Sequence, residues 1–196
     1  MRRSCGRSDW THDAASGPHP PPRADLSNEP VAVTTPLFVI RRLGNEDRSD
    51  FRCGEPSLDA YIRTGVGQDV RRQIATAFVA VDAATNALAG YYTLSATQVL
   101  FTDLDEDWRK RLPRYPSLPA VLVGRLAVDE RFKGRGLGGV LLFDAARRAM
   151  ASDIAARFMV VDALNEGAVR FYEHHGFRPV PDDERRLFVP LSVLGG

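Results

Sequence analysis

The stretch that decides the fold is Leu126-Ala127-Val128-Asp129-Glu130-Arg131-Phe132-Lys133-Gly134-Arg135-Gly136-Leu137-Gly138-Gly139-Val140. The apolar run 121–128 predicts a strand that ends inside it, and apolar residues at helical spacing from Leu137 onward predict a helix after it. The glycines between them let successive backbone N–H groups face one point, toward which the helix dipole also directs its positive end. Lys133 and Arg135 add full charges. The stretch therefore predicts a phosphate cradle, with pyrophosphate as the expected guest.

Two other phosphate-binding loops have a similar composition, and spacing argues against both. Gly134, Gly136 and Gly139 match the dinucleotide fingerprint G-x-G-x-x-G, but that fold needs its first glycine almost directly after the strand. Here the segment 129–133 intervenes. A Walker loop requires a closing Gly-Lys-Ser/Thr, which this stretch lacks.

The composition is that of an ordinary soluble protein with one domain. Of the 196 residues, 44% are hydrophobic and 26% charged, which is enough for one sizeable core. The net charge of +1 does not by itself demand a nucleic-acid partner. Cys5 and Cys53 are too few and too far apart for a disulfide framework or a zinc site. No apolar run reaches the ~18 residues of a membrane span, so we expect a cytoplasmic protein.

The chain divides into a tail and a domain. Residues 1–35 are rich in proline and poor in large apolar residues, so we expect a disordered N-terminal extension. For 36–196 we expect one mixed sheet flanked by helices, of the α/β or α+β class. Strands are predicted at 37–43, 75–81, 88–94, 121–128, 157–163 and 187–193, and helices near 56–62, 66–74, from 137, and at 166–174. The segment 99–119 is either a solvated connection or a lid on the substrate side.

Candidates for chemistry also lie outside the loop. Gly124 interrupts an apolar strand, which usually marks a bulge or a close backbone approach. Asn165 precedes a predicted helix, where it can cap the helix or contact a ligand. Tyr172 on that helix is either a core side chain or a catalytic acid. His174 and His175 point about 100° apart on a helix, so we expect no metal site there.

The sequences Leu-Ala-Val-Asp at 126–129 and Lys-Gly-Arg-Gly-Leu-Gly at 133–138 resemble the acyl-CoA loop of the GNAT superfamily of N-acetyltransferases. Lys133 stands where the family pattern has Gln or Arg. The resemblance implies the GNAT fold and acetyl-CoA as cosubstrate. It also implies that Tyr172, in Phe-Tyr-Glu-x-x-Gly-Phe, protonates the departing CoA thiolate, while the backbone at 126 and 128 holds the pantetheine arm. The implied cofactor contacts are Leu126, Ala127, Val128, Lys133, Gly134, Arg135, Gly136, Leu137, Gly138 and Asn165.

Further motifs narrow the resemblance to the TacT-type toxins of toxin–antitoxin pairs. These motifs are Phe-x-Cys-Gly-Glu-Pro-x-Leu-Asp at 51–59, Gly-Tyr-Tyr-Thr-Leu at 90–94 and Arg-Phe-Tyr-Glu at 170–173. The resemblance implies acetylation of the amino group of aminoacyl-tRNA, a ribbon-helix-helix antitoxin and a homodimer. For contacts with tRNA phosphates the candidates are Arg63, Arg71 and Arg72.

The sequence leaves other acceptors open. An α-amine titrates near ~8, so the reaction requires no strong general base, and none is evident in the sequence. A small-molecule or protein amine would use the same cofactor residues. A CoA-binding module without catalysis would keep them too.

Overall fold

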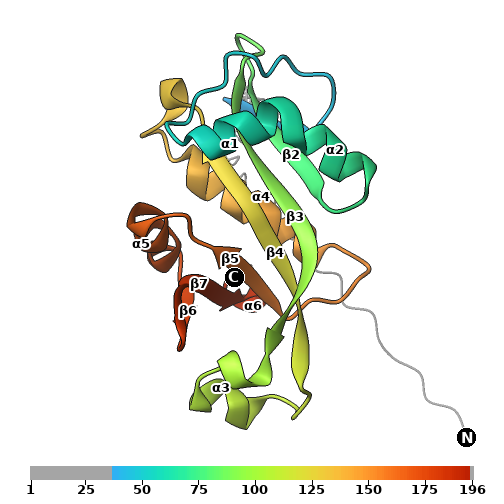
Figure 1. Ribbon diagram of the computed structural model, residues 1–196, viewed down its shortest axis with the longest axis vertical. Helices are drawn as coiled ribbons and strands as arrows, with labels where there is room; N and C mark the ends of the chain where they lie inside the picture. Colours follow the sequence, from blue (N-terminus) through green and yellow to red (C-terminus); the bar gives the residue numbers. More distant parts are fainter. Residues whose placement is uncertain (1–36, 195–196) are drawn as a thin grey trace, which may run out of the picture. The chain divides into compact units, whose positions relative to one another are not determined.

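A mixed sheet forms the centre of the computed structural model, which describes residues 37–194 (Figure 1). The sheet has seven strands in the order β1-β2-β3-β4-β5-β7-β6. The strands are β1 (Phe38–Arg42), β2 (Thr76–Asp82), β3 (Leu88–Leu100), β4 (Ser117–Val128), β5 (Phe158–Asp162), β6 (Arg178–Val180) and β7 (Asp183–Pro190). The pair β4 and β5 is parallel, and the other pairs in this part of the chain are antiparallel. The expected mixed sheet is confirmed; the tail predicted at 1–35 lies outside the described residues.

Helices cover both faces of the sheet. On one face, α1 (Pro56–Ala60), a π-helical turn (Tyr61–Gly65) and α2 (Val66–Arg71) follow one another without a break. On the opposite face lies α4 (Leu137–Met150), seen behind the strands in Figure 1. The remaining helices are α3 (Glu106–Arg111), α5 (Glu166–His174) and α6 (Leu191–Leu194), with 3-10 turns at Phe101–Asp103 and Glu130–Phe132.

The alternation of side chains along β3 assigns the two faces. Tyr91 belongs to a buried cluster with Ile62 and Val66, from the side of α1 and α2. Its neighbour Tyr92 belongs to a second buried cluster with Leu141 of α4. Because successive side chains of a strand point to opposite faces, the sheet is packed between these two helical layers.

The end of the chain departs from the sequence-based expectation. The apolar run predicts a strand at 187–193, whereas β7 ends at Pro190 and α6 begins at Leu191. Proline has no N–H with which to continue a strand ladder. Leu191 and Leu194 are both buried against the cluster that contains α4. The strand prediction is wrong beyond Pro190 because apolar residues three apart fit one face of a helical turn.

The hairpin of β3 and β4 is longer than predicted. β3 continues to Leu100 and β4 begins at Ser117, so the irregular segment shrinks to 101–116. Within that segment, α3 places Trp108 edge-on against Phe158, with ring centroids 6.0 Å apart. Figure 1 shows α3 at the end of the hairpin that lies away from α1. The packing of Trp108 fixes this segment against the sheet, which favours a connection over the lid on the substrate side that the sequence left open.

A bulge divides β4 into two halves. Its register with β3 shifts between Thr93 and Leu94, which leaves Gly124 as the extra residue. On its other side, β4 pairs with β5 over the segment 120–123. Past Gly124 the two parallel strands separate. The bulge predicted from this glycine is therefore confirmed, and it opens the sheet.

Candidate active site

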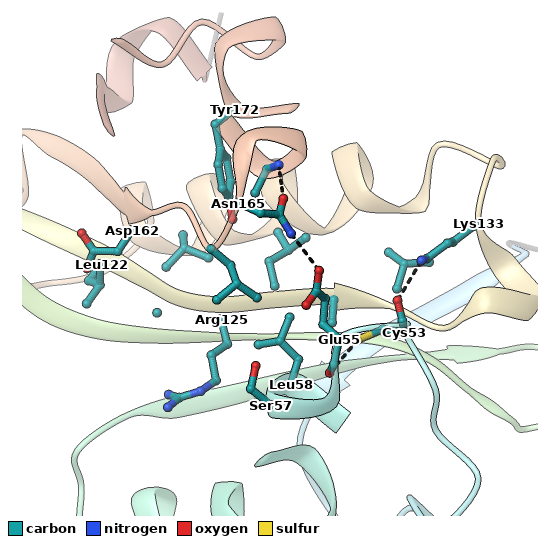
Figure 2. A pocket seen from close by; sticks show the side chains of 17 residues that line it. Cys53, Glu55, Ser57, Leu58, Leu122, Arg125, Lys133, Asp162, Asn165 and Tyr172 are labelled. Carbon is teal, nitrogen blue, oxygen red and sulfur yellow. Dashed lines mark hydrogen bonds between the residues drawn. The ribbon is translucent and has the colours of Figure 1, made fainter. Parts of the chain in front are cut away.

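A cavity of about 540 Å³ occupies the opening between β4 and β5 (Figure 2). Three segments that are distant in the sequence surround it: the bulged half of β4, the loop and first turn of α1, and the loop after β5 with α5. Its lining includes Cys53, Glu55, Arg125, Leu126, Val128, Lys133, Asn165 and Tyr172. Of the predicted cofactor residues, the strand positions 126–128, Lys133 and Asn165 line this cavity together with Tyr172. The loop residues 134–138 follow Lys133 and lie outside the lining.

The backbone of β4 beside the cavity has uncommitted hydrogen-bonding groups. The N–H of Asp129 donates to the carbonyl oxygen of Ala89 on β3, over 2.9 Å. Because successive N–H groups of a strand point to opposite sides, those of Leu126 and Val128 point away from β3. β5 has already separated from β4 at this level. These backbone groups therefore face the cavity, where an extended ligand can pair with them.

The glycine loop forms an open cradle at the N-terminus of α4. Gly134 and Gly136 have φ values of 74° and 75°, in the left-handed region that costs other residues ~1–2 kcal/mol. Gly136 precedes α4 without a side-chain hydrogen bond to the helix, so the N–H groups of the first turn stay available. A Cβ on Gly138 would lie 3.3 Å from the Phe171 ring, so this side of the loop must stay bare. The cradle fits a pyrophosphate.

The two basic residues of the loop are engaged differently. The Nζ of Lys133 donates to the carbonyl oxygen of Cys53 over 2.7 Å, which ties the loop to the segment before α1. Arg135 is exposed, and its guanidinium carbon lies 5.6 Å from the Phe132 ring. Arg135 can therefore meet a phosphate directly, whereas Lys133 already has one of its three N–H donors engaged with Cys53.

Tyr172 projects from α5 into the cavity (Figure 2). The residue is 7% exposed, and its ring centroid lies 5.4 Å from that of Phe177. Burial raises the pKa of the Tyr172 hydroxyl to about 12, so the group is protonated at neutral pH. Within residues 37–194 this hydroxyl has no hydrogen-bond partner, whereas those of Tyr61, Tyr91 and Tyr92 each donate to an oxygen. The ring of Tyr172 is thus part of the core, while its hydroxyl proton remains available for donation to a ligand in the cavity.

Asn165 caps the helix, the first of the two roles that the sequence left open, and it also lines the cavity. Its side-chain oxygen accepts from the N–H of Ala168 over 2.9 Å, which caps α5. Its amide nitrogen donates to Oε1 of Glu55 over 2.7 Å across the cavity. This bond connects the loop after β5 with the loop before α1, and both residues line the cavity.

The sequence analysis did not single out Glu55 and Arg125, which are two of the charged side chains of the cavity wall. Glu55 lies directly before Pro56 at the start of α1, and its second carboxylate oxygen remains available for an amine. Arg125 follows the bulge of β4, with its guanidinium carbon 3.6 Å from the centre of the Tyr61 ring. The carboxylate of Asp162 also lines the cavity but is paired with Arg186 at 2.9 Å. The position of Glu55 within the motif at 51–59 was the available signal.

Cys53 is a buried thiol in the cavity wall. Burial raises the pKa of the Cys53 thiol to about 11, and the nearby Asp59 adds to this shift. The sulfur lies 3.8 Å from the carbonyl oxygen of Glu55, to which it donates. At neutral pH the thiolate is a negligible fraction, which argues against acyl transfer through this residue.

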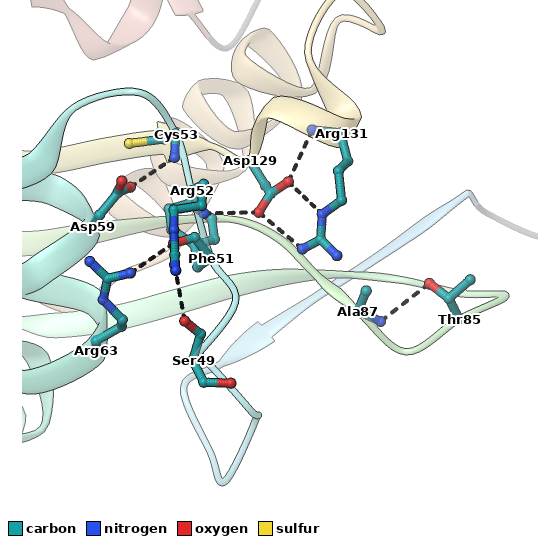
Figure 3. Close-up of polar contacts among 10 residues, drawn as sticks. All are labelled: Ser49, Phe51, Arg52, Cys53, Asp59, Arg63, Thr85, Ala87, Asp129 and Arg131. Atoms are coloured by element: carbon teal, nitrogen blue, oxygen red, sulfur yellow. Dashed lines mark hydrogen bonds and ion pairs between the residues drawn. The ribbon is translucent and has the colours of Figure 1, made fainter.

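Asp129 joins the glycine loop to the segment before α1 (Figure 3). Its carboxylate accepts from the backbone N–H of Arg52 over 3.1 Å and from Nε of Arg131 over 2.8 Å. The next residue, Glu130, donates its N–H to the carbonyl oxygen of Arg52 over 2.8 Å. Burial by itself would raise the pKa of Asp129, but the hydrogen bonds from Arg131 and Arg52 outweigh it and hold that pKa below its usual range. A buried charge thus clamps the two walls of the site together.

The predicted tRNA contacts lie outside the cavity. Nη1 of Arg63 points to the carbonyl oxygen of Phe51, at 3.4 Å. Arg71 and Arg72 are exposed at the end of α2. In the part of the chain that the structure describes, there is no group of three or more metal-ligating side chains, and no helix is long and apolar enough to span a membrane.

The glycine cradle, the open edge of β4 and the protonated tyrosine together define the site of an acyltransferase that uses a CoA thioester. Residues 41–177 match the model of the Acetyltransferase (GNAT) family, and the chain belongs to this family.

Particular relatives are toxins of this family. The chain is 34% identical to a tRNA-acetylating toxin of Mycobacterium tuberculosis, over 78% of this chain and 91% of the relative. AtaT complexed with acetyl-methionyl-tRNAfMet is 30% identical, with a TM-score of 0.74 over 81% of this chain and 97% of that one. A tyrosine-to-phenylalanine mutant of AtaT, bound to the C-terminus of the antitoxin AtaR and acetyl-CoA, is 27% identical, with a TM-score of 0.67 over 81% and 96%. The predicted toxin resemblance is confirmed.

Proposed function

We propose that the protein is a toxin that transfers the acetyl group of acetyl-CoA to the amino group of aminoacyl-tRNA and so blocks translation. One observation carries this proposal: a single cavity joins an unpaired strand edge to a protonated buried tyrosine, and its wall reaches Lys133, the residue directly before the glycine cradle. The solved complex of AtaT with acetyl-methionyl-tRNA supports the choice of acceptor.

The main chain holds and polarises the cosubstrate. The first-turn N–H groups of α4 and the side chain of Arg135 would bind the pyrophosphate. The backbone of Leu126 and Val128 would pair with the pantetheine arm in the gap beside β5. An N–H of the same edge would donate to the thioester oxygen as it gains negative charge, which lowers the barrier to attack. The solved AtaT complex with acetyl-CoA supports acetyl-CoA as the cosubstrate.

Two side chains manage the protons. The neutral amine attacks the thioester carbon, a C–N bond forms, the C–S bond breaks, and Tyr172 gives its proton to the departing sulfur. The nitrogen gives up one proton, for which Glu55 is the carboxylate beside the cavity. The proton on Glu55 then passes to solvent while solvent returns one to Tyr172, so both side chains regain their starting states. The products are the acetylated amine and free CoA.

The acceptor also indicates where the protein acts and what it binds. Charged tRNA is consumed in the cytoplasm, where we place the protein. We propose a ribbon-helix-helix antitoxin and a second copy of this chain as its protein partners. The complex of AtaT with the antitoxin AtaR supports an antitoxin partner. Arg71 and Arg72, exposed beside the face of α1 and α2, would add contacts to tRNA phosphates.

Transfer of labelled acetyl from acetyl-CoA to bulk charged tRNA tests the proposal. Uncharged tRNA, free amines and an acetylatable peptide serve as controls. Label on charged tRNA that is released as an N-acetyl amino acid on mild hydrolysis supports the toxin. Label confined to free amines or peptide would transfer the protein to another acceptor class.

A further inference from the structure

Arg125 occupies the side of the cavity that faces α1 and α2. Leu126 and Val128 pack on the cluster that contains α4, whereas Ala127 belongs to the cluster of the opposite face. Because side chains alternate along a strand, Arg125 lies on the same face as Ala127. Figure 2 shows its side chain directed away from Tyr172, on the side of β4 where Ser57 and Leu58 of α1 lie. Arg125 is thus separated from the glycine cradle and belongs to the acceptor side.

The guanidinium of Arg125 is held in place by an aromatic ring. Its central carbon lies 3.6 Å from the centroid of Tyr61, close enough for a stacked cation–π contact. The hydroxyl of Tyr61 is itself fixed, because it donates to Oδ2 of Asp69 over 2.9 Å. Tyr61 begins the π-helical turn between α1 and α2, a kind of turn that is frequent at functional sites. The cation is therefore positioned before any ligand arrives.

Arg125 has no carboxylate partner in residues 37–194. Other arginines of this part of the chain do have one: Arg131 pairs with Asp129 at 2.8 Å and Arg148 with Asp144 at 2.7 Å. A half-buried guanidinium that stacks by one face still presents N–H donors at its rim. Those donors match the geometry of a phosphate, which they can hold through two parallel bonds. The Arg125 guanidinium is therefore suited to bind an anionic group of a ligand on this side of the cavity.

The acceptor must supply that anion. In the proposed function, the cradle at the N-terminus of α4 would bind the phosphates of the cosubstrate, so these are not available to Arg125. A simple amine carries no anion and would leave the guanidinium partly desolvated and unpaired. An amino acid esterified to the 3′ end of tRNA carries phosphodiesters at a fixed distance from its amino group. Such an acceptor would place a phosphate at Arg125 and its amino group at Glu55 at the same time.

We propose that Arg125 is a specificity residue that binds a phosphate near the 3′ end of the acceptor tRNA and so selects a nucleic-acid-borne amine over a free amine. This inference rests on the proposed function. Arg125 touches the acceptor and not the reacting atoms, so it acts through affinity and placement.

The test compares two acceptors with the same amino group. Wild-type protein, Arg125→Gln and Arg125→Lys are assayed with aminoacyl-tRNA and with the methyl ester of the same amino acid. Arg125→Gln should raise KM for aminoacyl-tRNA and lower the selectivity for it over the ester by ~10- to 100-fold, the range of a charge-assisted hydrogen bond. The slope of log KM against log salt should fall by about 0.7 to 0.9, as for one phosphate contact. Arg125→Lys should restore part of the selectivity.

Arg178→Gln is the matched control, because Arg178 is an exposed cation on β6, away from the cavity. Thermal melting and acetyl-CoA titration verify that each variant is folded. An equal loss of activity on both acceptors would overturn the inference, since it would make Arg125 structural. Unchanged selectivity would overturn it as well. If wild-type protein acetylates the ester but not charged tRNA, the proposed function itself fails, and the inference falls with it.

Discussion

The replacement of Tyr172 by phenylalanine separates catalysis from packing. The Tyr172 hydroxyl has no hydrogen-bond partner in residues 37–194, and the ring packs beside Phe171 and Phe177. Removing the oxygen therefore breaks no bond and leaves no group unsatisfied, so the free energy of unfolding should change by less than ~1 kcal/mol. Loss of a general acid should lower kcat by ~10²- to 10⁴-fold.

The assay needs three readings on the same pair of proteins. Single-turnover transfer of labelled acetyl reports the chemical step, calorimetric titration reports acetyl-CoA affinity, and urea unfolding reports stability. We expect the first to fall and the other two to hold. Normal turnover by Tyr172→Phe would refute the assignment of the acid, and loss of acetyl-CoA affinity would make the hydroxyl a binding group.

The pH profile of wild-type protein provides a second reading of the same group. Burial raises the pKa of Tyr172 to about 12, above the ~10 of a free tyrosine. The acid should therefore stay protonated, and kcat should not fall with deprotonation of this group between pH 8 and pH 10. The raised pKa also means that its contribution to stability is present below pH ~10 and lost as the pH rises toward 12. An alkaline decline of kcat centred near pH 9 would contradict this account.

Three further predictions test the supports of the site. Gly136→Ala should raise KM for acetyl-CoA about tenfold, because alanine at a φ of 75° costs ~1–2 kcal/mol. The fold should be kept, since the added Cβ meets no atom within 4 Å. An unchanged KM would show that the cradle does not bind the cosubstrate. Asp144→Asn should destabilise the protein by ~2–4 kcal/mol in urea, because Asp144 binds Tyr92, Arg147 and Arg148. Burial by itself would raise the pKa of Asp144, but these hydrogen bonds outweigh burial and lower that pKa. The stabilisation by the carboxylate should therefore disappear as the pH falls through ~4 and below. A stability difference between wild type and Asp144→Asn that does not change with pH would disprove the ionic role. In a Cys5→Ser chain, alkylation of Cys53 at pH 8 should be ~100-fold slower than that of a free thiol, because burial raises the pKa of Cys53 to about 11. Rapid labelling would show that the cavity wall opens.

Local patterns predict those parts of the site that one segment builds alone. The cradle needs glycines at left-handed φ and a helix directly after them, and both are adjacent in the sequence. The bulge at Gly124 and the cap at Asn165 depend on their nearest neighbours in the same way. These features are therefore visible in a single sequence.

Features that depend on tertiary contacts are not visible in this way. Glu55 reaches the cavity through a hydrogen bond to Asn165, which is 110 residues away. Arg125 acquires its role from a ring on the π-helical turn, and no periodic pattern marks that turn. The boundary between β7 and α6 likewise depends on where Leu191 and Leu194 find a core.

In the proposed mechanism, the main chain at the open edge of β4 binds the pantetheine arm. Every amino acid except proline carries the N–H that this binding needs, so the identities of residues 126 and 128 matter mainly for packing. A genetic selection for inactive alleles should therefore recover many substitutions at Tyr172 but chiefly proline at these two strand positions. Such tolerance would let sequences diverge without loss of cosubstrate binding, and the fold itself is shared with AtaT at 27% identity.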